Sequence, residues 1–69
     1  MYRYLLEALI VKNMKEHSKM EHNQLVNEIF SKVKFPLTNA VIKDRIESLI
    51  GRDYMEVSED NPNLYLYVA

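Results

Sequence analysis

The spacing of apolar residues changes along this sequence, and the change restricts the folds that the chain can adopt. Up to Arg52 the apolar residues recur at intervals of three and four, as in helices that bury one face. From Met55 onward the pattern alternates from residue to residue, as in β-strands. We therefore expect an α+β fold in which the helices come first and the strands last.

Three helices are predicted in the first part of the chain. The first runs from about Tyr2 to His17 and the second from about His22 to Lys32. Pro36 prevents the second helix from continuing, and Thr38 offers a good N-cap for a third helix from Asn39 to about Arg52. The apolar faces of the three helices are expected to contain Leu5, Leu6, Leu9, Ile10 and Met14; Leu25, Val26, Ile29, Phe30 and Val33; and Ile42, Ile46, Leu49 and Ile50.

The last part of the chain is predicted to form a β-hairpin. Met55 to Ser58 and Leu64 to Val68 alternate as strands do, and the segment between them is rich in turn-forming residues. The short polar stretch Lys19 to Glu21 can add a brief third strand. Three helices followed by a hairpin is the order of a winged helix, in which the helices form the core and the hairpin is the wing. A generic small α+β domain with the same elements packed differently is the alternative.

The small size of the chain limits what this fold can contain. Its 69 residues are expected to form a single domain, residues 1–69, with a small core. The chain has no Cys and only one Gly, which excludes a disulfide framework, a thiolate metal site and a glycine-rich phosphate loop. Packing of apolar side chains must therefore hold the fold together, and no cofactor is expected.

Charge and hydropathy argue against nucleic acid and membrane as partners. The formal net charge of −1 provides no long-range attraction to phosphate. Outward positions of the third helix, which binds DNA in many winged helices, include Lys43, Asp44 and Glu47, and two of these three are acidic. No apolar run approaches the roughly 20 residues of a membrane helix, and no signal-peptide pattern is present. These features favour an intracellular protein of the cytoplasm and nucleus.

Residue types that carry catalysis or bind metals are not arranged for either role. His17 and His22 are five residues apart, whereas two metal ligands on one helix face require a spacing of four. Ser48 and Glu47 have no base or orienting residue at a recognisable spacing. We therefore expect neither an enzyme nor a metal site.

Segments spread over nearly the whole chain match the pattern of a known family. Residues 10–15 read Ile-Val-Lys-Asn-Met-Lys, and more specific matches follow at residues 34–37, 42–50, 52–56 and 61–63. The aromatic end, with Tyr65, Tyr67 and a final Ala69, adds a further match. Together these segments resemble the C-terminal winged-helix domain of cullins, the scaffolds of RING ubiquitin ligases, and in particular the cullin-four subgroup.

The resemblance implies a function that composition and spacing do not reveal. It implies that Lys15 accepts the ubiquitin-like modifier in neddylation, through an isopeptide bond. The chain would be a non-catalytic part of a larger scaffold, and its partners would be the modifier, the conjugating enzyme and the RING-box protein. Lys12 and Lys19 lie three residues before and four after Lys15, the spacings of one helix face, and are assigned to the same partner surface. Without the resemblance, these lysines would be an ordinary solvated helix face.

The sequence also departs from the cullin pattern around Lys15. Lys12 stands where the family usually has Arg, and Asn13 stands where it usually has an apolar Ile. The basic stretch that normally follows the acceptor reads Glu16-His17-Ser18 here. These departures weaken the local positive charge.

The predicted wing is apolar on both faces. Leu64 and Leu66 share one face, and Tyr65 and Tyr67 share the other. If the tyrosines pack inward, as in the family, Val57, Leu64 and Leu66 form an exposed patch of the kind that marks partner sites. In the alternative arrangement the leucines belong to the core and the tyrosines face outward.

Two other functions are compatible with the same fold. One is a diverged or engineered interaction domain that binds another protein through the wing patch or through Leu5, which is more apolar than its family counterpart. The other is a DNA-binding winged helix, which the acidic third helix argues against.

Overall fold

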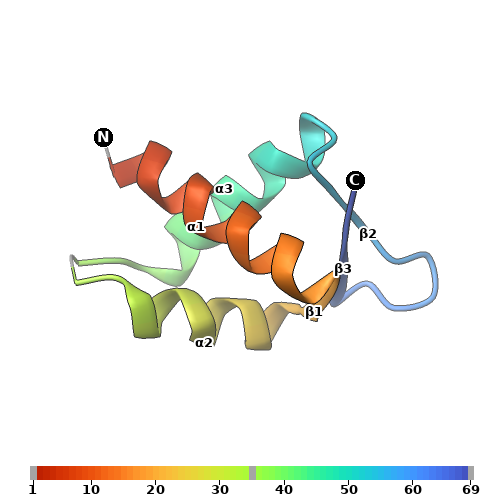
Figure 1. Ribbon diagram of the computed structural model, residues 1–69, viewed down its shortest axis with the longest axis horizontal. Coiled ribbons are helices and arrows are strands. Elements are labelled where there is room, and N and C mark those ends of the chain that lie inside the picture. The colour runs from red at the N-terminus through yellow and green to blue at the C-terminus, as the bar shows by residue number, and fades with distance from the viewer. Residues whose placement is uncertain (1, 35, 69) are drawn as a thin grey trace.

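Three helices and a small sheet make up the computed structural model, which describes residues 2–34 and 36–68 (Figure 1). Phe35 and Ala69, which contribute to the cullin resemblance, lie outside the described residues. The elements in chain order are α1 (Tyr2–His17), β1 (Lys19–Glu21), α2 (His22–Lys32), α3 (Asn39–Gly51), β2 (Met55–Val57) and β3 (Leu64–Tyr67). The predicted α+β order is confirmed, and α3 ends one residue before Arg52. None of the described helices is long and apolar enough to cross a membrane.

The sheet has three antiparallel strands in the order β1-β3-β2. The strand β3 therefore lies in the middle, although it is the last of the three in the sequence. Tyr65 pairs with Met20 of β1 on one side and with Val57 of β2 on the other. The brief strand that was predicted between the first two helices is confirmed, and it ties the end of α1 to the wing.

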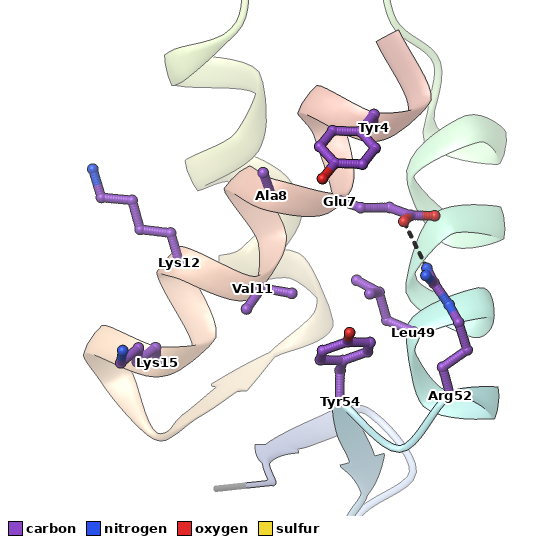
Figure 2. Close-up of a pocket in the computed structure, with 9 residues that line it drawn as sticks. All are labelled: Tyr4, Glu7, Ala8, Val11, Lys12, Lys15, Leu49, Arg52 and Tyr54. Carbon is purple, nitrogen blue, oxygen red and sulfur yellow. Dashed lines mark hydrogen bonds and ion pairs between the residues drawn. The ribbon is translucent and has the colours of Figure 1, made fainter. Parts of the chain in front are cut away.

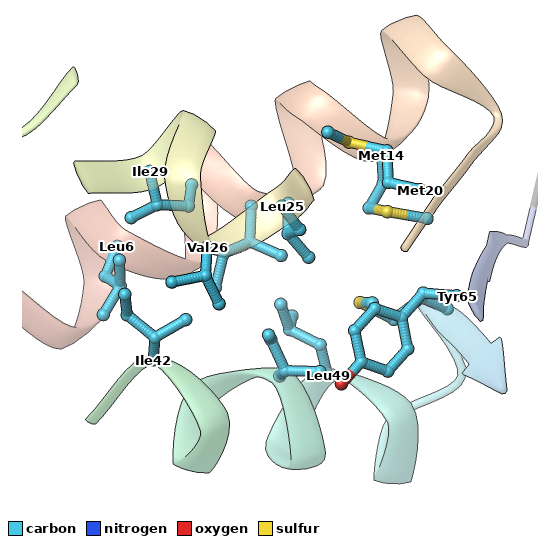
Figure 3. Close-up of a cluster of buried hydrophobic side chains, with 12 residues drawn as sticks. Leu6, Met14, Met20, Leu25, Val26, Ile29, Ile42, Leu49 and Tyr65 are labelled. Carbon is cyan, nitrogen blue, oxygen red and sulfur yellow. The ribbon is translucent and has the colours of Figure 1, made fainter. Parts of the chain in front are cut away.

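A single apolar cluster joins the helices to the sheet (Figure 3). Every element contributes at least one buried side chain, which explains how so short a chain closes its core without a disulfide. In Figure 3 the ring of Tyr65 points from the sheet toward Leu49 of α3. The cluster contains Leu6, Ile10, Met14, Met20, Leu25, Val26, Ile29, Ile42, Ile46, Leu49, Met55 and Tyr65.

The helix boundaries follow from local chemistry. The Thr38 hydroxyl accepts a hydrogen bond from the Val41 amide at 3.3 Å, which confirms the predicted N-cap of α3. Glu21 precedes α2 without a capping bond from its side chain. Ser18 and Asp53 follow α1 and α3 with φ of 67° and 64°, the left-handed conformation that stops a helix.

The tyrosines of the wing face the helices, as the resemblance implied. Tyr65 is buried, and Tyr67 is half-buried against the same core. The Tyr65 hydroxyl is hydrogen bonded to His22 Nδ1 at 2.9 Å, and the two rings meet edge to face. Burial, together with the nearby charge of Glu47, raises the pKa of Tyr65 above its ordinary value.

Three positions differ from the expected helix faces. Leu5 and Phe30 were expected on apolar faces, but they are exposed because the core of this small bundle reaches only part of each face. Asn13, in contrast, is fully buried, because it follows Leu6 and Ile10 at helical spacing on the inward face of α1. Its amide group donates to the Leu9 carbonyl at 2.9 Å.

Candidate functional site

Lys15 lies in the last turn of α1, and its side chain is exposed. The opposite face of this turn is anchored, because Met14 is fully buried and packs in the core. The helix end is also closed by His17, whose Nδ1 is hydrogen bonded to the Asn13 carbonyl at 2.9 Å. A well-fixed backbone therefore presents a freely accessible amine.

An open groove of about 420 Å³ begins beside Lys15 and runs between α1 and α3 (Figure 2). Its apolar surface comes from Ala8 and Val11 of α1 and from Leu49 of α3. The rings of Tyr4 and Tyr54 border it, and both tyrosines are exposed. The groove is thus a shallow apolar surface with aromatic edges.

An ion-pair network joins α1 to α3, and two of its members, Glu7 and Arg52, line the groove. Arg45 donates to Glu7 Oε2 at 2.8 Å and Arg52 donates to Glu7 Oε1 at 2.6 Å, so both carboxylate oxygens are used. Arg45 also pairs with Asp44. The hydrogen bond from Arg52, and a weaker contribution from Arg45, hold the pKa of Glu7 below its ordinary value against the opposing effect of desolvation.

Glu7 does not face the solvent, although it is charged. Its side chain is only 15% exposed, because Arg45 of α3 and Arg52 directly after α3 draw the carboxylate into the interface between the helices. The guanidinium of Arg52 also lies 5.6 Å from the centre of the Tyr54 ring, within the range of a cation–π contact. Glu7, Arg52 and Tyr54 therefore hold one another in place along the groove.

Lys12 and Lys15 lie on the α1 side of the groove, and Arg52 lies on the α3 side (Figure 2). In Figure 2 the side chain of Lys12 extends away from Arg52. Cations therefore border the apolar surface on both sides. Within residues 2–34 and 36–68, no group of three or more His, Asp or Glu side chains is placed to bind a metal ion.

Comparison with known proteins identifies the family. The pattern of the Cullin protein neddylation domain matches residues 2–61. The chain belongs to the cullin neddylation-domain family. It is 51% identical to human Cullin-4A over 67 residues, which are 97% of this chain and 9% of that protein. It is 36% identical to Cullin-4 of Caenorhabditis elegans, again over 97% of this chain and over 8% of the relative.

The similarity to Cullin-4A supports the cullin-four subgroup, and this domain spans about a tenth of the length of the curated relatives. Among solved structures, the chain matches one titled "A Dual E3 Mechanism for Rub1 Ligation to Cdc53: Dcn1(P)-Cdc53(WHB)" with a TM-score of 0.90. The two are 33% identical, and the match covers 97% of this chain and 79% of the other. The winged-helix fold is therefore confirmed.

The structure places only two of the three predicted lysines of this cullin domain together. Lys12 and Lys15 lie on one face of α1, but Lys19 does not continue that face. The left-handed backbone of Ser18 ends the helix, and Lys19 lies in β1, paired with Leu66. The expectation that all three share a helix face was wrong at Lys19.

The expected wing patch is also divided. Leu64 and Leu66 lie on the outer face of the sheet, where the pairing puts Leu66 between Lys19 and Glu56. Val57 pairs with Tyr65 and so lies on the opposite, helix-facing side, where it is 40% exposed at the edge. Leu64 and Leu66 are only half-buried, so their face is apolar but narrow.

Leu5, the other predicted contact residue, is 51% exposed, as a partner contact would require, but it does not line the groove.

Sequence reasoning did not find the groove or the ion-pair network. Glu7 and Arg52 are 45 positions apart in the sequence, and no local pattern links them. The only available signal was that Glu7 is the single acid on the polar side of the first two turns of α1.

Proposed function

We propose that this domain is a non-catalytic winged-helix module of a cullin-RING ubiquitin ligase scaffold, and that Lys15 is its acceptor for a ubiquitin-like modifier. The match to the Cullin protein neddylation domain is the observation that carries this proposal. The exposure of Lys15 at a well-anchored helix end supports it, because an acceptor amine must enter the active site of another protein.

The chemistry is acyl transfer from a thioester. The ε-amine nitrogen of Lys15 attacks the carbonyl carbon that joins the modifier to the cysteine of its conjugating enzyme. An amide bond to Lys15 forms, the carbon–sulfur bond breaks, and the cysteine leaves as a thiolate. The amine loses a proton in the same step. We assign the base to the partner, because the open surface around Lys15 leaves room for a catalytic group to approach.

The partners follow from the same proposal. The matched solved structure has a title that describes Rub1 ligation to Cdc53 and a complex of Dcn1 with Cdc53. By analogy, we assign to this domain a ubiquitin-like modifier, a conjugating enzyme and the RING-box protein of the ligase. The rest of the scaffold would supply most of the RING-box contact.

A conjugation assay with purified neddylation enzymes tests the assignment of Lys15. We expect the wild-type chain to gain one modifier, and Lys15→Arg to lose the product while keeping the positive charge. Lys12→Arg and Lys19→Arg are matched controls, and both should be modified like the wild type. Peptide mass spectrometry of the product identifies the linked lysine. An undiminished product with Lys15→Arg, or a linkage at Lys12, would show that the assignment is wrong.

A wing that binds a new partner is the weaker alternative. It was based on one continuous patch, and the sheet register separates Val57 from the two leucines. What is left is Leu64 and Leu66, bordered by charged neighbours on both adjacent strands. Such a narrow surface falls short of the contiguous apolar area that typical interfaces present.

A further inference from the structure

The groove between α1 and α3 differs in charge from the molecule as a whole. The chain has a formal net charge of −1, but the charged side chains that line the groove are Lys12, Lys15, Arg52 and Glu7. The negative charge of Glu7 is already matched by Arg45 and Arg52, each of which binds one of its oxygens. The groove is therefore a locally basic site on a weakly acidic protein.

The surface between these cations is apolar. Val11 is half-buried, and the nearly fully buried Leu49 forms the deepest part of the lining. The rings of Tyr4 and Tyr54 border this surface and are exposed. Such a surface can bury an apolar group of a ligand while the ligand's polar groups on either side lie within reach of the cations.

The size of the groove suits one large side chain and its neighbours. Ligand pockets typically measure about 300–1,000 Å³, and this groove of about 420 Å³ lies at the lower end of that range. It is open to solvent along α1, so an extended chain can enter and leave at its ends. Its wall is already fixed by the contacts among Glu7, Arg52 and Tyr54, which reduces the entropy lost on binding.

We propose that this groove docks a short segment of a partner protein in which one large apolar side chain is flanked by carboxylates. The apolar side chain lies over Val11 and Leu49, and the carboxylates pair with Lys12 on one side and Arg52 on the other. A basic segment would be repelled by these cations. A nucleic acid would match the cations but would leave the apolar surface uncovered. The proposal does not depend on Lys15 being a modifier acceptor.

Binding of a defined probe peptide to the 69-residue chain tests this proposal. The probe is the blocked peptide Glu-Asp-Phe-Asp-Glu, followed through the amide resonances of the ¹⁵N-labelled protein. We expect saturable shifts at Ala8, Val11 and Tyr54. Three comparison ligands are the same peptide with Lys for each acid, the same peptide with Gly for Phe, and a short oligothymidylate. Each should bind at least about tenfold more weakly, a difference of about 1.4 kcal/mol.

Two substitutions make the test specific to the groove. Ala8→Glu places a carboxylate on the exposed apolar surface of a helix that tolerates Glu, and it should weaken the probe about tenfold. Lys12→Glu should act in the same direction. Asn27→Glu is the matched control for Ala8→Glu, because it also adds one negative charge, but on the exposed face of α2. It should leave the affinity for the probe unchanged. Circular dichroism confirms that each variant is folded.

Several results would overturn the proposal. These are equal binding of the acidic and basic peptides, stronger binding of the oligonucleotide, shifts centred outside the groove, or unchanged affinity in both Ala8→Glu and Lys12→Glu. The readout involves no conjugation step. Failure here and failure of Lys15 as acceptor would therefore be recorded separately.

Discussion

At the scale of single residues, Asn13 has the most unusual environment. It is fully buried among apolar neighbours, where an unpaired amide would cost about 1–3 kcal/mol. Its oxygen accepts from Lys32 Nζ at 3.1 Å, and its nitrogen donates to the Leu9 carbonyl. Lys32 Nζ also lies 3.7 Å from Oε2 of Glu28, one turn earlier on α2. A polar residue is thus accommodated in the core because a lysine from another helix reaches it.

Replacing Lys32 tests this account of Asn13. We expect Lys32→Met to lower the free energy of unfolding by about 1 kcal/mol, because the Asn13 oxygen loses its donor in a buried site. The double variant Asn13→Leu/Lys32→Met should recover at least that loss, since no polar group is then left unpaired. Urea unfolding followed by circular dichroism measures both.

Glu28→Gln is the matched control for the exposed ion pair. It should lower the free energy of unfolding by only a few tenths of a kcal/mol, which is about the contribution of a surface ion pair one helical turn apart. If Lys32→Met were no more costly than Glu28→Gln, the bond to Asn13 would contribute nothing to stability.

Sequence reasoning at this scale succeeded where a residue's surroundings are local. Thr38 was identified as an N-cap from its position before a helical pattern, and its hydroxyl does cap α3. The burial of Asn13 was missed, because a polar residue is assigned to the solvent side unless its partner is known. That partner, Lys32, is 19 positions away.

At the scale of elements, Glu7 fastens α1 to α3. One carboxylate receives hydrogen bonds from Arg45 of α3 and from Arg52, which follows that helix directly and lies about two turns beyond Arg45. The helices cannot rotate relative to each other without breaking one of these bonds. Since both helices also line the groove, the same ion pairs fix the shape of that surface.

The ion pairs of Glu7 predict how stability depends on pH. Its pKa is lower in the folded chain, so its contribution to stability is complete above the ordinary glutamate value of about 4.5. It is lost as the pH falls from there through the lower pKa of the folded state. We expect Glu7→Gln to lower the free energy of unfolding by about 0.5 kcal/mol at pH 7. This is the magnitude of an ion pair that solvent partly screens.

Urea unfolding at several pH values measures this effect. The stability difference between wild type and Glu7→Gln should shrink as the pH is lowered below about 4.5. Glu16→Gln, an exposed position on the same helix, is the control and should show a smaller difference. A difference for Glu7→Gln that stayed constant down to acid pH would contradict the assigned ion pairs.

The elements themselves were largely predictable, but their partners were not. Changes of hydrophobic period and the Pro36 break located the helices and the hairpin to within one residue. The inward direction of the wing tyrosines came from the resemblance, because alternation alone left both faces apolar. The wing patch was wrongly predicted because the face on which Val57 lies depends on the register that pairs it with Tyr65. That register is set by the turn between β2 and β3, and the alternation of residues does not specify the length of this turn.

At the scale of the whole molecule, one core serves both helices and sheet. The buried cluster includes a side chain from every element, so no part of the described chain has a core of its own. With no disulfide to hold part of the chain together, loss of the sheet would expose Met20 and Met55 and weaken the helical packing at once.

Unfolding is therefore expected to be a single cooperative transition. Far-UV circular dichroism reports on the helices. Because the chain has no Trp, the fluorescence of a variant in which Tyr2, Tyr4 and Tyr54 are replaced by Phe reports on the sheet through Tyr65 and Tyr67. Both signals should give the same urea midpoint and slope, with a slope of about 1 kcal/mol per molar urea for so small a domain. A tyrosine transition at clearly lower urea would reveal a wing that unfolds independently.

The central position of β3 has a consequence for the order in which the domain is completed during translation. The segment that follows α1 pairs with a strand from the far end of the sequence, and the amide of Tyr67 also donates to the Ser18 carbonyl at 2.8 Å. While a ribosome is still making that strand, the helix end that carries Lys15 has no sheet to hold it. Enzymes that meet a nascent chain before β3 is made would encounter a fraying helix terminus, and only a chain in which β3 has paired with β1 offers them the anchored one.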